Sequence, residues 1–172
     1  MKKIFLVLAV CFSAAAMTAQ KFAMVDMDYI LKNIPSYESA NDQLTQLSTK
    51  WQKEVEAKLT EIQTMYKNYN TEMVFLSAEM KSKREDEIKA AEREADNLKR
   101  KYFGPDGELF KKREALIKPI QDEIYNAVQE ICNSKGYQLI MDKKASSGII
   151  FASPKIDISD EVLNQLGYSN SK

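Results

Sequence analysis

The stretch LTQLSTKWQKEVEAKLTEIQTMYKNYNTEMVFL, residues 44–76, decides the fold of this chain. Its apolar residues recur at spacings of three and four, which places them on one face of an α-helix. They are Leu44, Leu47, Trp51, Val55, Leu59, Ile62, Tyr66, Tyr69, Met73 and Leu76. One extra four-residue step between Trp51 and Leu59 is typical of a coiled-coil stutter. A single apolar stripe does not hold so long a helix in water, so the pattern predicts a partner helix.

A second helix is predicted to begin at Ala78, directly after the first one ends. Ser77 is a favourable N-cap, and Glu79 places a carboxylate in the first turn, where the helix dipole favours it. The apolar seam of this helix consists of Ile88, Ala91, Ala95, Leu98, Tyr102, Leu109, Leu116, Ile120, Ile124, Ala127 and Ile131. The two seams predict a long antiparallel hairpin, a coiled-coil arm over residues 36–114 with its tip near residues 73–77. About 38 residues at about 1.5 Å each give this arm a length of about 55–60 Å.

Helix-breaking residues mark the places where the arm can bend. Pro119 lies within the second helical pattern and is expected to kink it, because proline removes a backbone hydrogen bond. The sequence GPDG at residues 104–107 predicts a local bulge or kink. The alternative, a true chain reversal at GPDG, would leave much of the apolar seam uncovered. The hinge candidates are Pro35, Gly104, Pro105, Gly107 and Pro119.

Residues 20–35 and 115–172 are predicted to form a small body at the root of the arm. Strands are expected at about residues 22–26, 138–142 and 148–152, with a hairpin loop at 143–147 between the last two. Ser159 is expected to cap a short helix at about residues 160–166. Three short strands cannot close a sheet or bury a sizeable core alone, so strands from several copies are expected to join.

Residues 1–19 are predicted to be a secretory signal peptide that is removed. Lys2 and Lys3 are basic, the apolar run at 4–17 is too short to span a bilayer, and Ala19 is a suitable residue before a cleavage site. The mature chain keeps one thiol, Cys132, which is expected to be a half-buried helix residue without a redox role.

The composition excludes several classes of function. The chain has no histidine, the commonest metal ligand and the usual general base near neutral pH. It carries 25 basic and 25 acidic residues, so no net positive charge favours nucleic acid as a partner. It also has no glycine-rich phosphate-binding loop. We therefore expect neither an enzyme nor a protein that needs a metal or cofactor.

Four segments together cover the root of the arm and the body. They are FAMVDMDYIL at 22–31, REALIKPIQDEIYNAVQEI at 113–131, GYQLIMD at 136–142 and GIIFASPKIDISDEVLNQL at 148–166. In these segments the sequence resembles the Skp (OmpH-type) family of periplasmic chaperones, and the likeness covers nearly the whole mature chain. The arm itself is general coiled-coil sequence and adds little to the resemblance.

The resemblance implies a mainly α-helical, jellyfish-like homotrimer. Its small β-barrel body is built from strands of all three chains, and three helical hairpins surround a cavity. Family members hold unfolded outer-membrane proteins in that cavity, in the periplasm and without ATP. The expected partners are therefore these unfolded proteins, two further copies of the chain and, transiently, a membrane surface. The trimer-body candidates are Phe22, Met24, Val25, Leu139, Ile140, Met141, Ile149, Ile150 and Phe151.

Apolar residues near the tip are the candidates for contact with an unfolded client. They are Tyr66, Tyr69, Met73, Val74, Phe75 and Met80. Each buried group would contribute about 1–2 kcal/mol, and three tethered arms would convert such weak contacts into avidity. The alternative is that these side chains pack only within the hairpin.

Two further expectations concern charge and function. Several family members are strongly basic, whereas residues 36–134 carry more acidic than basic side chains, so no lipopolysaccharide site is predicted. The alternative function is a structural coiled-coil adaptor of the cell envelope, which would bind one defined partner tightly.

Overall fold

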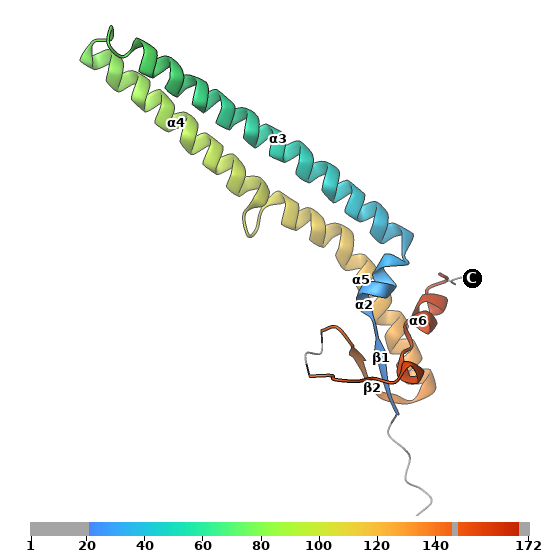
Figure 1. The fold of residues 1–172 in the computed structure, drawn as a ribbon. Helices are drawn as coiled ribbons and strands as arrows, with labels where there is room; N and C mark the ends of the chain where they lie inside the picture. The colour runs from blue at the N-terminus through green and yellow to red at the C-terminus, as the bar shows by residue number, and fades with distance from the viewer. Residues whose placement is uncertain (1–20, 146–147, 169–172) are drawn as a thin grey trace, which may run out of the picture. The chain divides into compact units, whose positions relative to one another are not determined.

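The structure is a computed structural model that describes residues 21–145 and 148–168. The predicted signal peptide lies outside the described residues. In chain order the elements are β1 (Lys21–Val25), α2 (Met27–Lys32), α3 (Pro35–Glu72), α4 (Ala78–Phe103), α5 (Glu108–Lys135), β2 (Tyr137–Asp142), the 3-10 helix η2 (Pro154–Ile156) and α6 (Ser159–Gln165) (Figure 1). The expectation of a mainly helical chain with a small β element is confirmed. Among these described helices, none combines the length and the apolarity that a membrane crossing requires.

The chain divides into two compact units, each with its own internal contacts. The arm unit is Ile34–Asp122, and the body unit contains the described residues before and after it. Helix α5 contributes residues to both units.

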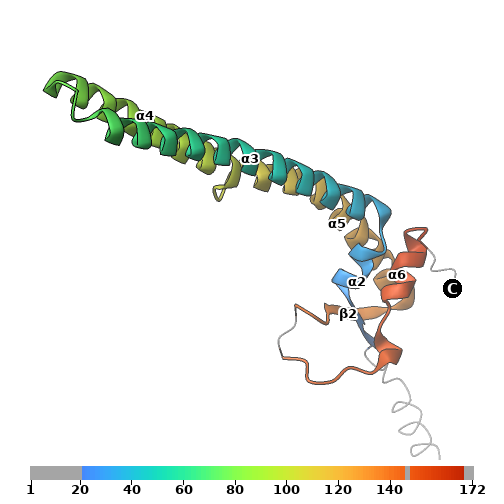
Figure 2. The same ribbon diagram turned by 45° about the horizontal axis from the view of Figure 1, so that its top comes forward.

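Helices α3 and α4 form the antiparallel hairpin of the arm unit and lie side by side in both views (Figures 1 and 2). Pro35 occupies the first turn of α3, where its missing N–H costs nothing and its fixed φ suits a helix. At the other end of the hairpin, the Ser77 hydroxyl accepts a hydrogen bond from the Met80 N–H at 3.3 Å, so Ser77 is the N-cap of α4 as the sequence predicts. Leu44 and Ile62 of α3 are buried, as are Ile88 and Ala95 of α4.

The GPDG sequence forms a loop between α4 and α5, and the chain does not reverse there. Figures 1 and 2 both show the helical path continuing alongside α3 after the loop. Backbone hydrogen bonds run through the interruption, from Gly104 N–H to the Arg100 carbonyl at 2.9 Å and from Gly107 N–H to the Gly104 carbonyl at 2.9 Å. The prediction of a local interruption is confirmed, and the alternative of a reversal is wrong.

In the body unit, β1 and β2 pair in parallel, with Phe22 opposite Leu139 and Met24 opposite Met141. A parallel pair requires a crossover connection, and here that connection contains α2 to α5. The body core combines one face of α5 with residues from the other elements of the unit. Its buried side chains include Ala23, Met24, Val25, Ile30, Leu31, Ile124, Ala127, Ile131, Val162 and Leu163.

The strand predicted at residues 148–152 is absent, and so is the hairpin that would join it to β2. On the edge of β1 away from β2, the Met24 carbonyl accepts a hydrogen bond from the Ile158 N–H at 2.9 Å, and Asp157 forms a single bridge. Ile150 and Phe151 are largely exposed. The prediction was wrong because strand propensity identifies residues that suit a pleated surface but not whether a neighbouring strand is available.

Candidate functional site

The hairpin tip carries an exposed apolar cluster, defined here as the tip cluster: Met73, Val74, Phe75 and Met80. The turn that presents it is closed by backbone hydrogen bonds, from Met73 N–H to the Tyr69 carbonyl and from Phe75 N–H to the Glu72 carbonyl, both at 2.8 Å. Val74 is 74% exposed and Phe75 is 87% exposed. Large apolar side chains that gather in solvent in this way are typical of an interaction surface.

The two tyrosines near the tip have a role within the hairpin. The Tyr66 hydroxyl donates to Glu92 at 2.8 Å, and the Tyr69 hydroxyl donates to Glu85 at 2.5 Å. The hydrogen bond to a carboxylate is the main reason why the pKa of each phenol is raised. These bonds hold α3 against α4, while Tyr66 as a whole residue remains 43% exposed. Its phenol therefore joins the two helices and still offers an apolar ring to a partner.

A second aromatic cluster lies near the end of α4, and sequence reasoning did not group its members. Trp51 and Tyr102 stack with their ring centroids 4.8 Å apart, and Phe103 meets the Tyr102 ring edge-on at 6.3 Å. The Tyr102 hydroxyl also donates to Glu54 at 2.6 Å. The only signal in the sequence was that Trp51 and Tyr102 both belong to predicted seams.

Beside this cluster the two helices form a shallow apolar groove, here named the arm groove. Its volume is about 240 Å³. It is lined by Gln52, Val55, Glu56, Leu59, Lys99 and Phe103. Leu59 belongs to the predicted buried seam of α3, yet it is 49% exposed.

The trimer-body candidates fall into three groups by their exposure. Met24 and Val25 are buried inside the chain's own body unit. The reason is that one face of β1 is already covered within the single chain. Ile140, Met141 and Ile149 are half-buried, whereas the others have substantial exposed surface: Phe22, Leu139, Ile150 and Phe151. The pairing of Phe22 with Leu139 places two of these exposed residues on neighbouring strands.

The hinge candidates also differ in their surroundings. The chain passes between the units after Asn33 and after Asp122, close to Pro35 and Pro119. The GPDG loop instead lies inside the arm unit, where its backbone is tightly packed. A side chain added at Gly107 would lie 2.8 Å from the Tyr102 carbonyl oxygen.

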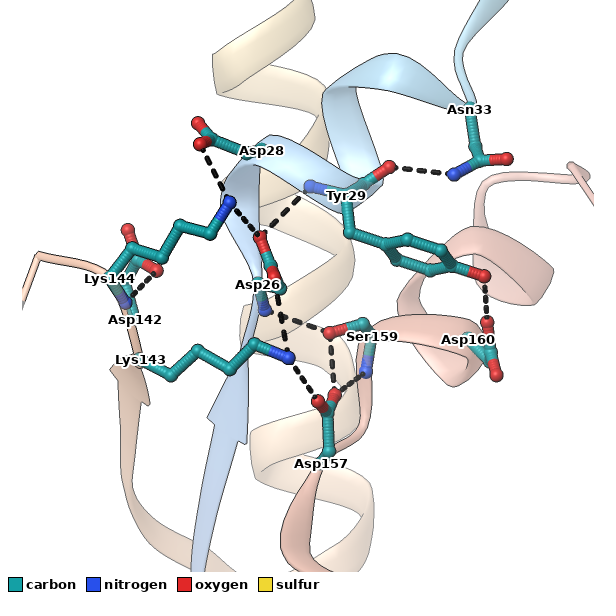
Figure 3. A network of polar contacts seen from close by, with 10 residues as sticks. All are labelled: Asp26, Asp28, Tyr29, Asn33, Asp142, Lys143, Lys144, Asp157, Ser159 and Asp160. Carbon is teal, nitrogen blue, oxygen red and sulfur yellow. Dashed lines mark hydrogen bonds and ion pairs between the residues drawn. The ribbon is translucent and has the colours of Figure 1, made fainter. Parts of the chain in front are cut away.

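A network of charged and polar side chains joins the ends of β1 and β2 to the start of α6 (Figure 3). The Lys143 ammonium lies 2.8 Å from the Asp157 carboxylate and 3.3 Å from that of Asp26. Lys144 lies 2.9 Å from Asp28 and 3.6 Å from Asp26. Sequence reasoning missed this network, because nothing in the local pattern relates Asp26 to two lysines far along the chain.

Ser159 is part of the same network, and its side chain does not cap α6. Its hydroxyl accepts the Asp26 N–H at 2.8 Å and donates to the Asp157 carboxylate at 2.6 Å. It is the first residue of α6, and Asp157 accepts its N–H at 2.9 Å. The expectation that Ser159 caps this helix was therefore wrong, because Ile158 occupies the N-cap position and the Ser159 hydroxyl bonds to Asp26 and Asp157 instead.

Comparisons with known proteins agree on one family. A family model described as outer membrane protein (OmpH-like) matches residues 21–166. The chain is 26% identical over 163 residues to a protein named chaperone protein Skp from Yersinia enterocolitica, with 90% of each chain covered. A protein of the same name from Pectobacterium atrosepticum shows the same identity and coverage.

A solved structure is similar in fold. It is a protein from Caulobacter crescentus described as an OmpH-like outer membrane chaperone, with a TM-score of 0.67 and 11% identity. The match covers 87% of this chain and 85% of that one. At this identity the likeness concerns the fold alone.

Proposed function

This chain belongs to the OmpH-like family, and we propose that it is a periplasmic chaperone that holds unfolded outer-membrane proteins without ATP. The observation that carries the proposal is the exposed tip cluster, in which Val74 and Phe75 are largely exposed. A folded arm gains no stability from apolar side chains left in water, so these residues are better suited to a partner.

The mechanism follows from many weak contacts. Each tip side chain that an unfolded client covers would contribute about 1–2 kcal/mol, which is too little for tight binding at one point. Three arms that act on one client would raise the overall affinity, because the second and third contacts are intramolecular. The client can leave whenever its own folding becomes more favourable, so release requires no nucleotide.

The proposed assembly is a homotrimer with a cavity between the arms. Support comes from the exposed apolar residues of the body unit, Phe22, Leu139, Ile150 and Phe151, and from the two-stranded sheet. A two-stranded sheet is marginal alone, and strands from neighbouring copies would extend it.

The hinge proposal is centred on Pro35 and Pro119. Both lie close to the points where the chain passes between its two units, so bending there would change the cavity without disturbing the packing of the hairpin. The periplasmic location rests on the signal peptide predicted at residues 1–19. Transient contact with a membrane surface is the remaining part of the proposal.

The test uses the mature chain from Gln20 and an unfolded outer-membrane barrel protein diluted from urea, with no nucleotide. Light scattering on a sizing column should detect a discrete soluble complex. The double variant Val74→Ser, Phe75→Ser should hold less client. The matched control Thr64→Ser, Thr71→Ser changes exposed polar residues of α3, the helix that precedes the tip, and should hold as much client as the unmodified chain. Client that aggregates equally with or without the chain would contradict the chaperone function.

The second candidate function is a structural adaptor of the cell envelope. It is favoured by the charged surface of the arm, where Lys58 lies 3.2 Å from Glu61 and 3.4 Å from Glu94. A well-solvated charged surface suits a single matched partner better than many unfolded chains. The same experiment separates the two functions, because an adaptor would leave the client to aggregate.

A further inference from the structure

We propose that the arm groove is a second client-contact site, which binds one large apolar side chain of an extended, unfolded polypeptide. The inference rests on the proposed chaperone function and adds to it a site away from the tip cluster. Four of its lining residues come from α3 and two, Lys99 and Phe103, come from the last turns of α4.

The groove exists because of the stutter in α3. Two successive four-residue steps, from Trp51 to Val55 and on to Leu59, rotate the apolar stripe away from its partner helix. Leu59 is consequently 49% exposed, whereas Ile62, one turn later, is again only 7% exposed. On α4, Phe103 is the last helical residue before the GPDG loop. The apolar surface at this point is therefore a consequence of the sequence pattern.

The size of the groove indicates what it can hold. Its volume of about 240 Å³ is below the range of about 300–1,000 Å³ that is usual for small-molecule sites. A folded protein partner would cover about 800 Å² on each side, far more than a groove lined by six residues. One aromatic or branched aliphatic side chain is the occupant that matches.

The rim of the groove indicates that the side chain comes from an unfolded polypeptide. Glu56 and Lys99 lie on opposite helices, and no ion pair within the described part of the chain uses either of them. An extended peptide can donate a backbone N–H to Glu56 and offer a carbonyl to Lys99. In a folded protein most backbone groups already have partners, whereas in an unfolded chain they are free. The two opposite charges also give no preference for acidic or basic clients.

The chain contains its own reporter for this site. Trp51 is its only tryptophan, and it stacks on Tyr102, whose ring contacts Phe103 of the groove. A side chain that enters the groove should therefore alter the fluorescence of Trp51.

The experiment compares two exposed apolar residues of the arm unit, one inside the groove and one outside. Leu59→Ser removes a lining residue, and Phe110→Ser is the matched control, because the two native side chains are 49% and 45% exposed. The client is an unfolded barrel protein without tryptophan. We expect client to dissociate roughly tenfold faster from Leu59→Ser, measured by Trp51 fluorescence. The reason is that the binding free energy of one covered Leu side chain corresponds to about a tenfold change in affinity. Client should dissociate from Phe110→Ser at the same rate as from the unmodified chain.

A peptide titration tests the groove without a client. The probe is a Gly/Ser peptide with one central Phe, and its control has Ser at that position. The Phe peptide should shift the methyl NMR signals of Val55 and Leu59 and change Trp51 fluorescence, whereas the Ser peptide should do neither. Absence of these shifts would overturn the inference even if the client still forms a soluble complex.

Two other outcomes would also overturn it. Equal acceleration by Leu59→Ser and Phe110→Ser would indicate general apolar contact along the arm. A change in the mass of the chain alone in Leu59→Ser would indicate that a second copy occupies the groove. Failure of the proposed function is recognised separately, because then the unmodified chain would form no client complex at all.

Discussion

Two carboxylates, Asp26 and Asp157, hold the body unit together at the end of β1. They share the Lys143 ammonium, and the Asp26 side chain is only 12% exposed. The Ser159 hydroxyl links the two through the Asp26 N–H. Because these groups are partly buried, each depends on the others for its hydrogen bonds, and removing one leaves a charge without its partner.

This network makes the body unit sensitive to acid. Burial alone would raise the pKa of Asp26, but the Tyr29 N–H and Lys143 hold it below its ordinary value of 3.8. Burial would likewise raise the pKa of Asp157, and Lys143 and Ser159 lower it. A carboxyl whose pKa is lower in the folded state adds stability above its unfolded pKa, and this stability is lost as the pH falls through the folded value. Hydrogen exchange of residues 21–33 should therefore show less protection at about pH 3 than at about pH 5.

The variant Asp157→Asn isolates this effect. At neutral pH, residues 21–33 of this variant should be less protected from hydrogen exchange than those of the unmodified chain. On acidification, the variant should lose less of its remaining protection than the unmodified chain does. The matched control is Asp122→Asn, because Asp122 is 62% exposed in its ion pair with Lys118. This control should keep the original pH profile. If Asp157→Asn also kept the pH profile of the unmodified chain, the network would not be the source of the acid sensitivity.

The helices α4 and α5 act as one interrupted element. The GPDG loop leaves the helical path after Phe103 and returns to it at Glu108, with Gly107 N–H bonded to the Gly104 carbonyl. Its glycines are required by close packing, since neither has a positive φ. A side chain at Gly104 would collide with the Arg100 carbonyl oxygen. This packing favours a fixed turn over a freely moving hinge.

Gly107→Ala should therefore destabilise the arm. The added methyl group would lie 2.8 Å from both the Gly104 nitrogen and the Tyr102 carbonyl oxygen. Overpacking of this kind costs about 1–3 kcal/mol. The measurement is the urea midpoint by far-UV circular dichroism, with Trp51 fluorescence as a local probe. Asp106→Ser, a change at an exposed residue of the same loop, should alter stability by no more than about 0.5 kcal/mol. Equal midpoints for the two variants would instead favour a loop that opens without strain.

Within its described residues, the single chain leaves apolar surface of the body unit exposed. Phe22 and Leu139 are exposed on neighbouring strands, and Phe151 is 83% exposed. Within the described residues, no strand pairs with the outer edge of β2. These features explain why the proposed function depends on more than one copy.

The double variant Leu139→Ser, Phe151→Ser should weaken this association. We expect the unmodified chain to sediment as a trimer with a melting temperature that rises with protein concentration, because association stabilises the folded chain by mass action. The variant should shift toward single chains and melt at a lower temperature. Phe110→Ser, which removes an exposed aromatic residue from the arm unit, should remain a trimer. An unmodified chain that is monomeric at micromolar concentration would contradict the proposed assembly.

The sequence alone was sufficient for the features that depend on neighbours along the chain. The spacing of Leu44, Ile62 and Ile88 predicted the paired helices, and Ser77 predicted the start of α4. The family was also identified from short segments, and the match over residues 21–166 confirms it. Helical periodicity and capping act over a few residues, so they can be read locally.

The tertiary structure alone decided the features that depend on residues distant in the sequence. The pairing of Asp26 with Lys143 and the bridge between Met24 and Asp157 required the chain to return to β1 after α5. The absence of a strand at 148–152 was decided in the same way. A residue's own pattern states which surface it prefers, but only the folded chain determines which partner lies against that surface.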